Sequence, residues 1–124
     1  MAEKPKILAI DDDPVVLRLL TDMLTSSYEL QISKSPKEAM TLIEKHKPDL
    51  ILLDIAIPVI SGFEFLHYLR QSPKFRDLPV IIVSGYIETE FIMYAEHEGI
   101  SGTVGKPINK EDLLKKIELA INPK

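Results

Sequence analysis

The hydrophobic residues of the chain follow two different spacings along the sequence. Short, nearly continuous apolar runs rich in Ile, Val and Leu are typical of strands buried on both faces of a sheet. Three such runs are Ile7–Ile10, Leu50–Leu53 and Val80–Val83. Two weaker strands are expected at Tyr28–Ser33, whose alternating pattern suggests a place near an edge, and at Ser101–Val104.

The segments between these strands repeat apolar residues at helical spacing, which predicts five helices. Ser35 stands before Pro36 and three residues before Glu38, the pattern of a capping box with proline at the first helical position. Ser61 and Asn109 are expected to cap two further helices. The helical positions expected to face a core are Val16, Leu20, Met23, Leu24, Ala39, Met40, Ile43, Leu66, Leu69, Ile92, Ala95, Leu113, Leu114, Ile117 and Ile121.

Strands that alternate with helices in this way predict an α/β fold. The expected architecture is a doubly wound, five-stranded parallel sheet with helices on both faces. A length of 124 residues is typical of one domain, so residues 1–124 are expected to form a single unit. The hydrophobic content of 45% and charged content of 27% fit a globular domain rather than a disordered chain.

Composition excludes several kinds of protein. The chain has no cysteine, which rules out a disulfide framework and a thiolate metal site. No apolar run approaches the ~20 residues of a membrane span, and the first residues, MAEKPK, lack the apolar segment of a secretory signal. A net charge of −4 argues against direct nucleic-acid binding. A cytoplasmic protein with no membrane partner is therefore expected.

Charged and polar residues follow the predicted strands. In an open parallel sheet, ligands bind at the carboxyl ends of the strands, and these ends meet at one edge. The residues expected at that edge are Asp11, Asp12 and Asp13 after the first strand, Asp54 after the third, Ser84 after the fourth and Lys106 after the fifth.

Carboxylates held together at such an edge repel one another. One pair at ~4 Å costs about 4 kcal/mol at an effective dielectric near 20, and a bound divalent cation removes that cost. Oxygen ligands without cysteine or a nearby histidine suit Mg²⁺ or Mn²⁺. A lysine and a hydroxyl beside the cation would stabilise a transferring phosphoryl group. The pattern therefore predicts a magnesium site that works on phosphate.

With these residues in place, the chain resembles the receiver domains of two-component response regulators over essentially its whole length. The matching features are the pair Asp11-Asp12, Asp54 closing the run Leu50-Ile51-Leu52-Leu53-Asp54, the spacing D-x-x-x-P-x-x-x-G of Asp54, Pro58 and Gly62, Ser84 of Val83-Ser84-Gly85, and Lys106-Pro107. Each motif alone is weak, but all five occur in order and each lies at or just after a strand end. The resemblance implies a flavodoxin-like sheet with the strand order 2-1-3-4-5, counted along the chain.

The resemblance implies that Asp54 takes a phosphoryl group from a phosphohistidine. The donor would be a sensor histidine kinase or a histidine phosphotransfer protein. Asp12 and Asp54 would bind Mg²⁺ directly together with the backbone carbonyl of Ala56, and Asp11 would act largely through water.

Further roles follow from the same resemblance. Ser84 would hydrogen-bond the phosphoryl oxygens, and Lys106 would pair with them and join Pro107 through a cis peptide bond. Asp13 lies outside the family's ligand set, and its place before Pro14 predicts a helix cap. Phosphorylation would change the face formed by the last two helices and the fifth strand. The domain would then be a signalling switch that controls a partner or passes phosphate along a relay, not an enzyme that turns over a separate substrate.

Thr103 departs from the family pattern. Receivers usually carry an aromatic residue three positions before the lysine, so the usual coupling between the hydroxyl residue and that ring is in question here. Tyr86, two residues after Ser84, is expected to shield a phosphoaspartate from water. Thr103 also keeps open a different function, a receiver that binds partners without being phosphorylated.

An enzyme is the other alternative. Asp11, Asp13 and the valine that follows also fit the D-x-D-x-V motif of haloacid-dehalogenase-type phosphatases. Asp11 would then be the nucleophile and Asp13 the acid or base, with Ser84 and Lys106 as the later motifs. The chain is short for that family, and the motif leaves Asp54 without a role.

Overall fold

The computed structural model describes residues 4–54, 59–85 and 89–122, without the side chains of 59–61, 63 and 89–92. Strands and helices alternate in the described chain as β1 Lys6–Ile10, α1 Pro14–Leu24, β2 Glu29–Ser33, α2 Pro36–His46, β3 Leu50–Leu53, α3 Val59–Gln71, β4 Val80–Ser84, α4 Thr89–Glu98, β5 Gly102–Gly105 and α5 Lys110–Ile121. None of these helices is long and apolar enough to span a membrane.

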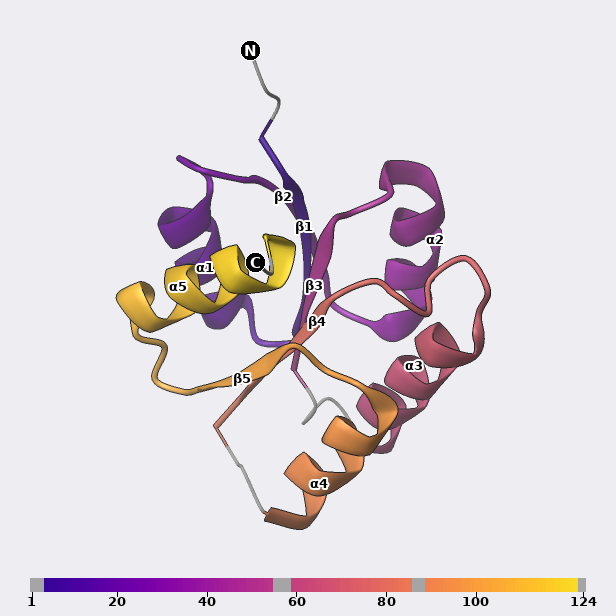
Figure 1. Ribbon diagram of the computed structural model, residues 1–124. Coiled ribbons are helices and arrows are strands. Elements are labelled where there is room, and N and C mark those ends of the chain that lie inside the picture. The colour runs from indigo at the N-terminus through magenta and orange to yellow at the C-terminus, as the bar shows by residue number, and fades with distance from the viewer. Residues whose placement is uncertain (1–3, 55–58, 86–88, 123–124) are drawn as a thin grey trace.

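All strand pairings are parallel, and the order in the sheet is β2-β1-β3-β4-β5. Helices α1 and α5 cover one face of the sheet, and α2, α3 and α4 cover the other (Figure 1). The α/β fold, the doubly wound sheet and the strand order are therefore confirmed. The two strands with the weakest sequence signal, β2 and β5, lie at the two edges, where one side of each strand has no neighbour.

Successive residues of each central strand face opposite layers. In β1, Ile7 and Ala9 pack with α1 and α5, whereas Leu8 and Ile10 pack with α2, α3 and α4. Every residue of β3 and β4 is buried. Burial on both faces explains why these strands are apolar runs rather than alternating patterns.

The start of α2 follows the predicted capping box. Ser35 Oγ accepts a hydrogen bond from the Glu38 N–H (3.2 Å), and Glu38 Oε1 accepts one from the Lys34 N–H (3.2 Å). Asn109 caps α5 as predicted by accepting from the Asp112 N–H. The predicted cap at Ser61 is wrong, because α3 already begins at Val59. Packing of the apolar face of a helix outweighs a local cap signal of this kind.

The predicted core positions of α1 all pack on the core but omit one residue. Leu20 and Leu24 are buried as expected, but the third buried residue is Leu17. Val16 and Met23 are only partly buried beside the same core. In α4, Ala95 is buried as predicted, and the side chain of Ile92 lies outside the described ones.

Candidate functional site

The first and third strands deliver two aspartates to the carboxyl edge of the sheet. The Asp11 N–H donates to the carbonyl of Ser33 (3.0 Å), and the Asp54 N–H donates to the carbonyl of Ile10 (2.9 Å). These bonds extend the strand ladders by one residue at their carboxyl ends. Backbone hydrogen bonds therefore hold the main chain of both aspartates, and these residues are only 2% and 4% exposed.

Lys106 joins the two aspartates. Its Nζ donates to Asp11 Oδ2 at 3.0 Å and to Asp54 Oδ2 at 3.1 Å. Lys106 directly follows β5, and its own N–H donates to the carbonyl of Ser84 at 3.2 Å. One ammonium group thus lies between two buried carboxylates that come from different strands, as the strand-end argument predicts.

Asp12 completes an acidic cluster with room for a cation. One carboxylate oxygen from each of Asp11, Asp12 and Asp54 lies within 4.8 Å of the others, and Asp12 is exposed to solvent. Together with Lys106, the three carboxylates leave a formal charge of −2, which one divalent cation balances. The donors are all hard oxygens, which Mg²⁺ prefers. The residues present therefore fit a magnesium ion.

The close packing of these charges shifts two pKa values. Burial raises the pKa of the Asp11 carboxyl, and the charge of Asp54 raises it further, against hydrogen bonds from the Asp13 N–H and Lys106 that lower it. Burial alone would lower the pKa of the Lys106 ammonium. Its hydrogen bonds to Asp11 and Asp54, and their charges, outweigh burial and raise that pKa. Lys106 is therefore charged at neutral pH.

Ser84 lies next to this lysine. It is the last residue of β4 and is 1% exposed. A Cβ atom on Gly85 would lie 3.5 Å from Lys106 Cβ, so a larger side chain there would extend over the lysine. The peptide bond between Lys106 and Pro107 is cis, as predicted.

Asp13 has the separate role that its position predicts. Its Oδ1 accepts from the Val15 N–H at 2.9 Å and caps α1. Its own N–H donates to Asp11 Oδ1 at 2.9 Å. The cap thereby also restrains the Asp11 carboxylate.

Other residues named from the sequence fall in different places. Ala56, Pro58 and Tyr86 lie outside the described residues. Gly62 is buried in α3. Thr103 is half-buried in β5, and its carbonyl accepts a hydrogen bond from Lys116 Nζ at 2.7 Å.

Sequence reasoning missed Ser33, which positions the site from the edge strand. Ser33 ends β2, is 1% exposed, and its carbonyl holds the Asp11 N–H. Its Oγ donates to the Ser35 carbonyl at 2.7 Å, which fixes the turn into α2. Ser33 is the polar residue that ends the second strand, which is the same sequence signal that marks Asp54, Ser84 and Lys106.

The fold and this arrangement of charges define a class of protein. Residues 7–118 match the response regulator receiver domain. The chain belongs to this family, whose members are phosphoacceptor switches of two-component signalling. The match makes the chain a regulatory domain and decides against the phosphatase alternative.

Individual relatives agree with this assignment. The chain is 31% identical over 118 residues to the polar-differentiation response regulator DivK of Brucella ovis, covering 90% of this chain and 92% of DivK. It is similar to a CheY-like receiver domain structure from Methanospirillum hungatei, with a TM-score of 0.88, 29% identity and coverage of 98% and 96%. It is also 23% identical to the sensor histidine kinase TmoS of Ectopseudomonas mendocina, over 99% of this chain but only 13% of the kinase.

Proposed function

We propose that Asp54 is the residue that accepts the phosphoryl group, from a phosphohistidine of a sensor histidine kinase or a histidine phosphotransfer protein. A carboxylate oxygen of Asp54 attacks phosphorus, the phosphorus–nitrogen bond breaks, and the imidazole leaves with the electron pair. Water later attacks the acyl phosphate and returns aspartate and inorganic phosphate. The observation that supports this is the pairing of buried Asp54 with Lys106 inside a cluster that also holds Asp11 and Asp12.

The other site residues would stabilise the negative charge of the phosphoryl group. Asp11, Asp12 and Asp54, with the carbonyl of Ala56, would hold Mg²⁺, which when bound would offset negative charge on the phosphoryl oxygens. Lys106 would exchange its contact with Asp54 for one with a phosphoryl oxygen. Ser84, at the end of the adjacent strand, would donate a hydrogen bond to another.

The output surface would be the face of α4, β5 and α5. Large apolar side chains are exposed on these helices: Met93 is 63% and Tyr94 43% exposed on α4, and Leu119 is 56% exposed on α5. An exposed apolar surface is typical of a site that binds a protein partner. Added charge at Asp54 would shift the equilibrium between two arrangements of this face. With Thr103 in place of an aromatic residue, the shift would not run through a ring at that position.

The domain would work as a cytoplasmic switch formed by residues 1–124. It would catalyse only its own phosphorylation and dephosphorylation. Its output would be a bound partner or the next protein of a phosphorelay.

The test is mass spectrometry of the intact protein and of its peptides after incubation with acetyl phosphate and Mg²⁺. We expect one phosphoryl group on Asp54, which is absent in Asp54→Asn and when EDTA replaces Mg²⁺. Asp13→Asn serves as the matched control, because it removes a neighbouring carboxylate outside the proposed ligand set and should keep the label.

Two results would overturn the proposal. Label on Asp11 with steady release of phosphate would make the chain a phosphatase in spite of its fold. No label under any condition, with an intact fold by circular dichroism, would leave a receiver that acts by binding alone.

A further inference from the structure

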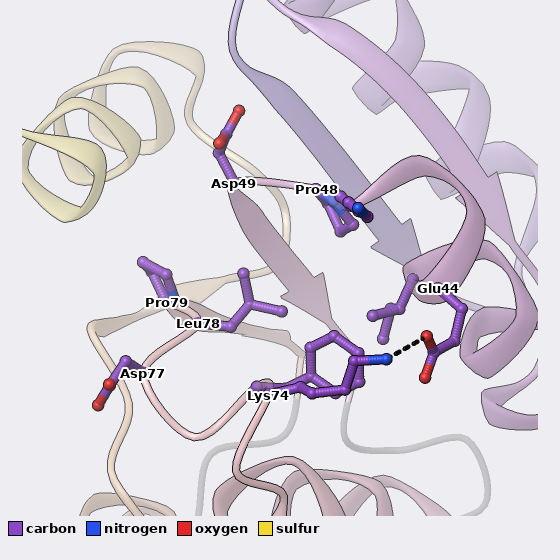
Figure 2. A pocket seen from close by; sticks show the side chains of 10 residues that line it. Glu44, Pro48, Asp49, Lys74, Asp77, Leu78 and Pro79 are labelled. Atoms are coloured by element: carbon purple, nitrogen blue, oxygen red, sulfur yellow. Dashed lines mark hydrogen bonds and ion pairs between the residues drawn. The ribbon is translucent and has the colours of Figure 1, made fainter.

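The amino ends of the parallel strands form what we call the amino edge of the sheet, which lies opposite the acidic cluster. This edge carries a pocket of about 530 Å³. It lies between the end of α2, the start of β3 and the loop from α3 to β4 (Figure 2). Its apolar lining comes from Ile43, Pro48, Phe75, Leu78 and Pro79. The volume and lining are those of a site that receives a large apolar side chain or a small ligand.

The wall of this pocket is held in place before any ligand arrives. Arg70 is half-buried, and its Nη1 donates to the carbonyls of Phe75 (3.3 Å) and Arg76 (3.2 Å). Its Nε donates to the carbonyl of Gly99 at 2.8 Å, which ties the same loop to the end of α4. A pocket whose wall is already ordered loses little conformational entropy on binding.

Across the pocket, Lys74 is joined to Glu44 at 2.9 Å, while Asp49 and Asp77 lie away from this pair (Figure 2). The Asp49 carboxylate accepts from the Lys6 N–H at 2.8 Å. The charge of Asp77 acts on Arg70 and raises its pKa, against burial that lowers it more strongly. Each of the three acids of this pocket therefore already has a donor or a cation.

A second pocket of about 420 Å³ adjoins the first, and the two share Lys47 and Asp49. Its lining includes Lys4, Lys6 and Lys47. The side-chain Nζ atoms of Lys4 and Lys6 donate to neutral carbonyls, of Thr25 and His46 respectively. In the part of the chain that the structure describes, none of these three lysines forms an ion pair.

The charge of the combined surface is opposite to that of the chain. Four lysines and three acids line the two pockets, which leaves one positive charge in a protein whose net charge is −4. The uncompensated charges are those of Lys4, Lys6 and Lys47, which line the second pocket, and Lys47 also lines the apolar pocket. A ligand that complements this surface carries negative charge next to a large apolar group.

We propose that the amino edge binds an acidic peptide segment of a partner protein, whose aromatic or branched aliphatic side chain enters the apolar pocket. The acidic residues beside that anchor face Lys4, Lys6 and Lys47. Because this edge lies opposite Asp54, the peptide leaves the phosphoacceptor edge free. The site would hold a partner in both states of the switch.

The probe is a blocked seven-residue peptide of Asp and Glu with one central Phe, titrated into ¹⁵N-labelled protein and followed by amide chemical shifts. We expect saturable shifts at Lys47, Asp49, Phe75 and Leu78, with a Kd below about 1 mM. Replacing the central Phe by Ser should weaken binding at least about tenfold, since the ring no longer fills the apolar pocket. Raised salt should weaken binding, because charge at an exposed surface is screened.

Variants of the protein test whether the charges of the lysines contribute to binding of the peptide. Lys4→Glu combined with Lys47→Glu should weaken the Phe peptide by about tenfold. Lys34→Glu combined with Lys37→Glu is the control, because it makes the same charge change near the other end of α2, and it should leave the Kd within about twofold.

Four results of the peptide titrations would overturn the proposal. They are no saturable shifts, shifts centred on α4, β5 and α5 or on the carboxyl edge, equal binding of the Phe and Ser peptides, and equal weakening by the control pair Lys34→Glu and Lys37→Glu. Octyl phosphate binding the same residues more tightly than the Phe peptide would also overturn it, and would assign the edge to a small amphiphilic anion.

Discussion

The strands of the sheet have their carboxyl ends at one edge and their amino ends at the opposite edge. Ion pairs at this carboxyl edge and this amino edge have nearly the same length and very different surroundings. At the carboxyl edge, Lys106 lies 3.0 Å from Asp11 and 3.1 Å from Asp54, whose side chains are 3% and 5% exposed. At the amino edge, Lys74 lies 2.9 Å from Glu44, and these side chains are 68% and 53% exposed. Distance alone would rank the three contacts as equal.

The ion pairs at the two edges differ in their exposure to solvent and not in their lengths. Water screens the exposed pair, and fixing two long side chains costs entropy, so such a pair contributes little. The buried carboxylates have lost most of their hydration, and removing their partner would leave that loss uncompensated. The carboxyl edge therefore suits a site where a change of charge has large effects, and the amino edge suits one where a partner can bind without disturbing the fold.

The largest effect is expected from Lys106→Met, which removes the shared cation from two buried carboxylates. We expect the free energy of unfolding in magnesium-free buffer to fall by about 3 kcal/mol. Urea unfolding measures this, with Lys115→Met on the exposed side of α5 as the control. A loss no larger than that of the control would show that the buried contacts add nothing to stability.

The next effect concerns the cation that balances the acidic cluster. Mg²⁺ at about ten times its Kd should stabilise the protein by roughly 1.4 kcal/mol, because it binds the folded state. Asp12→Asn should lose most of this gain in stability, since it removes one of the three carboxylates of the cluster. Thermal unfolding with MgCl₂ and with EDTA measures both, and Asp22→Asn, an exposed acid of α1, is the matched control. If Mg²⁺ stabilised Asp12→Asn and Asp22→Asn equally, Asp12 would not be a ligand of the cation.

A smaller effect tests whether every acid at the carboxyl edge behaves alike. Asp13→Ala should lower the free energy of unfolding by about 1 kcal/mol, because α1 loses its cap. Asp13→Asn keeps an oxygen that accepts from the Val15 N–H and should cost almost nothing. If Asp13→Asn destabilised as much as Asp13→Ala, the charge of Asp13 would matter and not its capping bond. Chemical denaturation of the two variants distinguishes these cases.

The smallest effect is expected at the exposed pair. A double-mutant cycle with Lys74→Met and Glu44→Gln should give a coupling below about 0.5 kcal/mol. A coupling energy as large as the loss of about 3 kcal/mol expected for Lys106→Met would contradict the conclusion that solvent exposure decides the strength of these contacts. Urea unfolding of the two single variants and the double variant supplies the cycle.

Local patterns allowed much of the fold to be predicted. The apolar runs placed the central strands, and the capping signals placed the starts of α1, α2 and α5. Errors occurred where several residues compete for one position. In α1, Leu17 is buried in the core although it was not predicted, whereas the predicted Val16 is only partly buried against that core, and α3 begins before Ser61.

The residue types that follow each strand can be recognised from the sequence alone, because burial on both faces makes strands visible as apolar runs and their ends visible as polar residues. Which of those residues contact one another depends on the folded structure. Lys106 contacts Asp54 across 52 positions and Asp11 across 95, and the order of strands in the sheet makes both contacts possible. The pockets at the amino edge depend equally on long-range packing, since Lys4, Lys47 and Phe75 belong to separate segments. Hydrophobic periodicity is local and can be read along the chain, whereas the strength of a charge contact depends on desolvation, which exists only after the chain has folded.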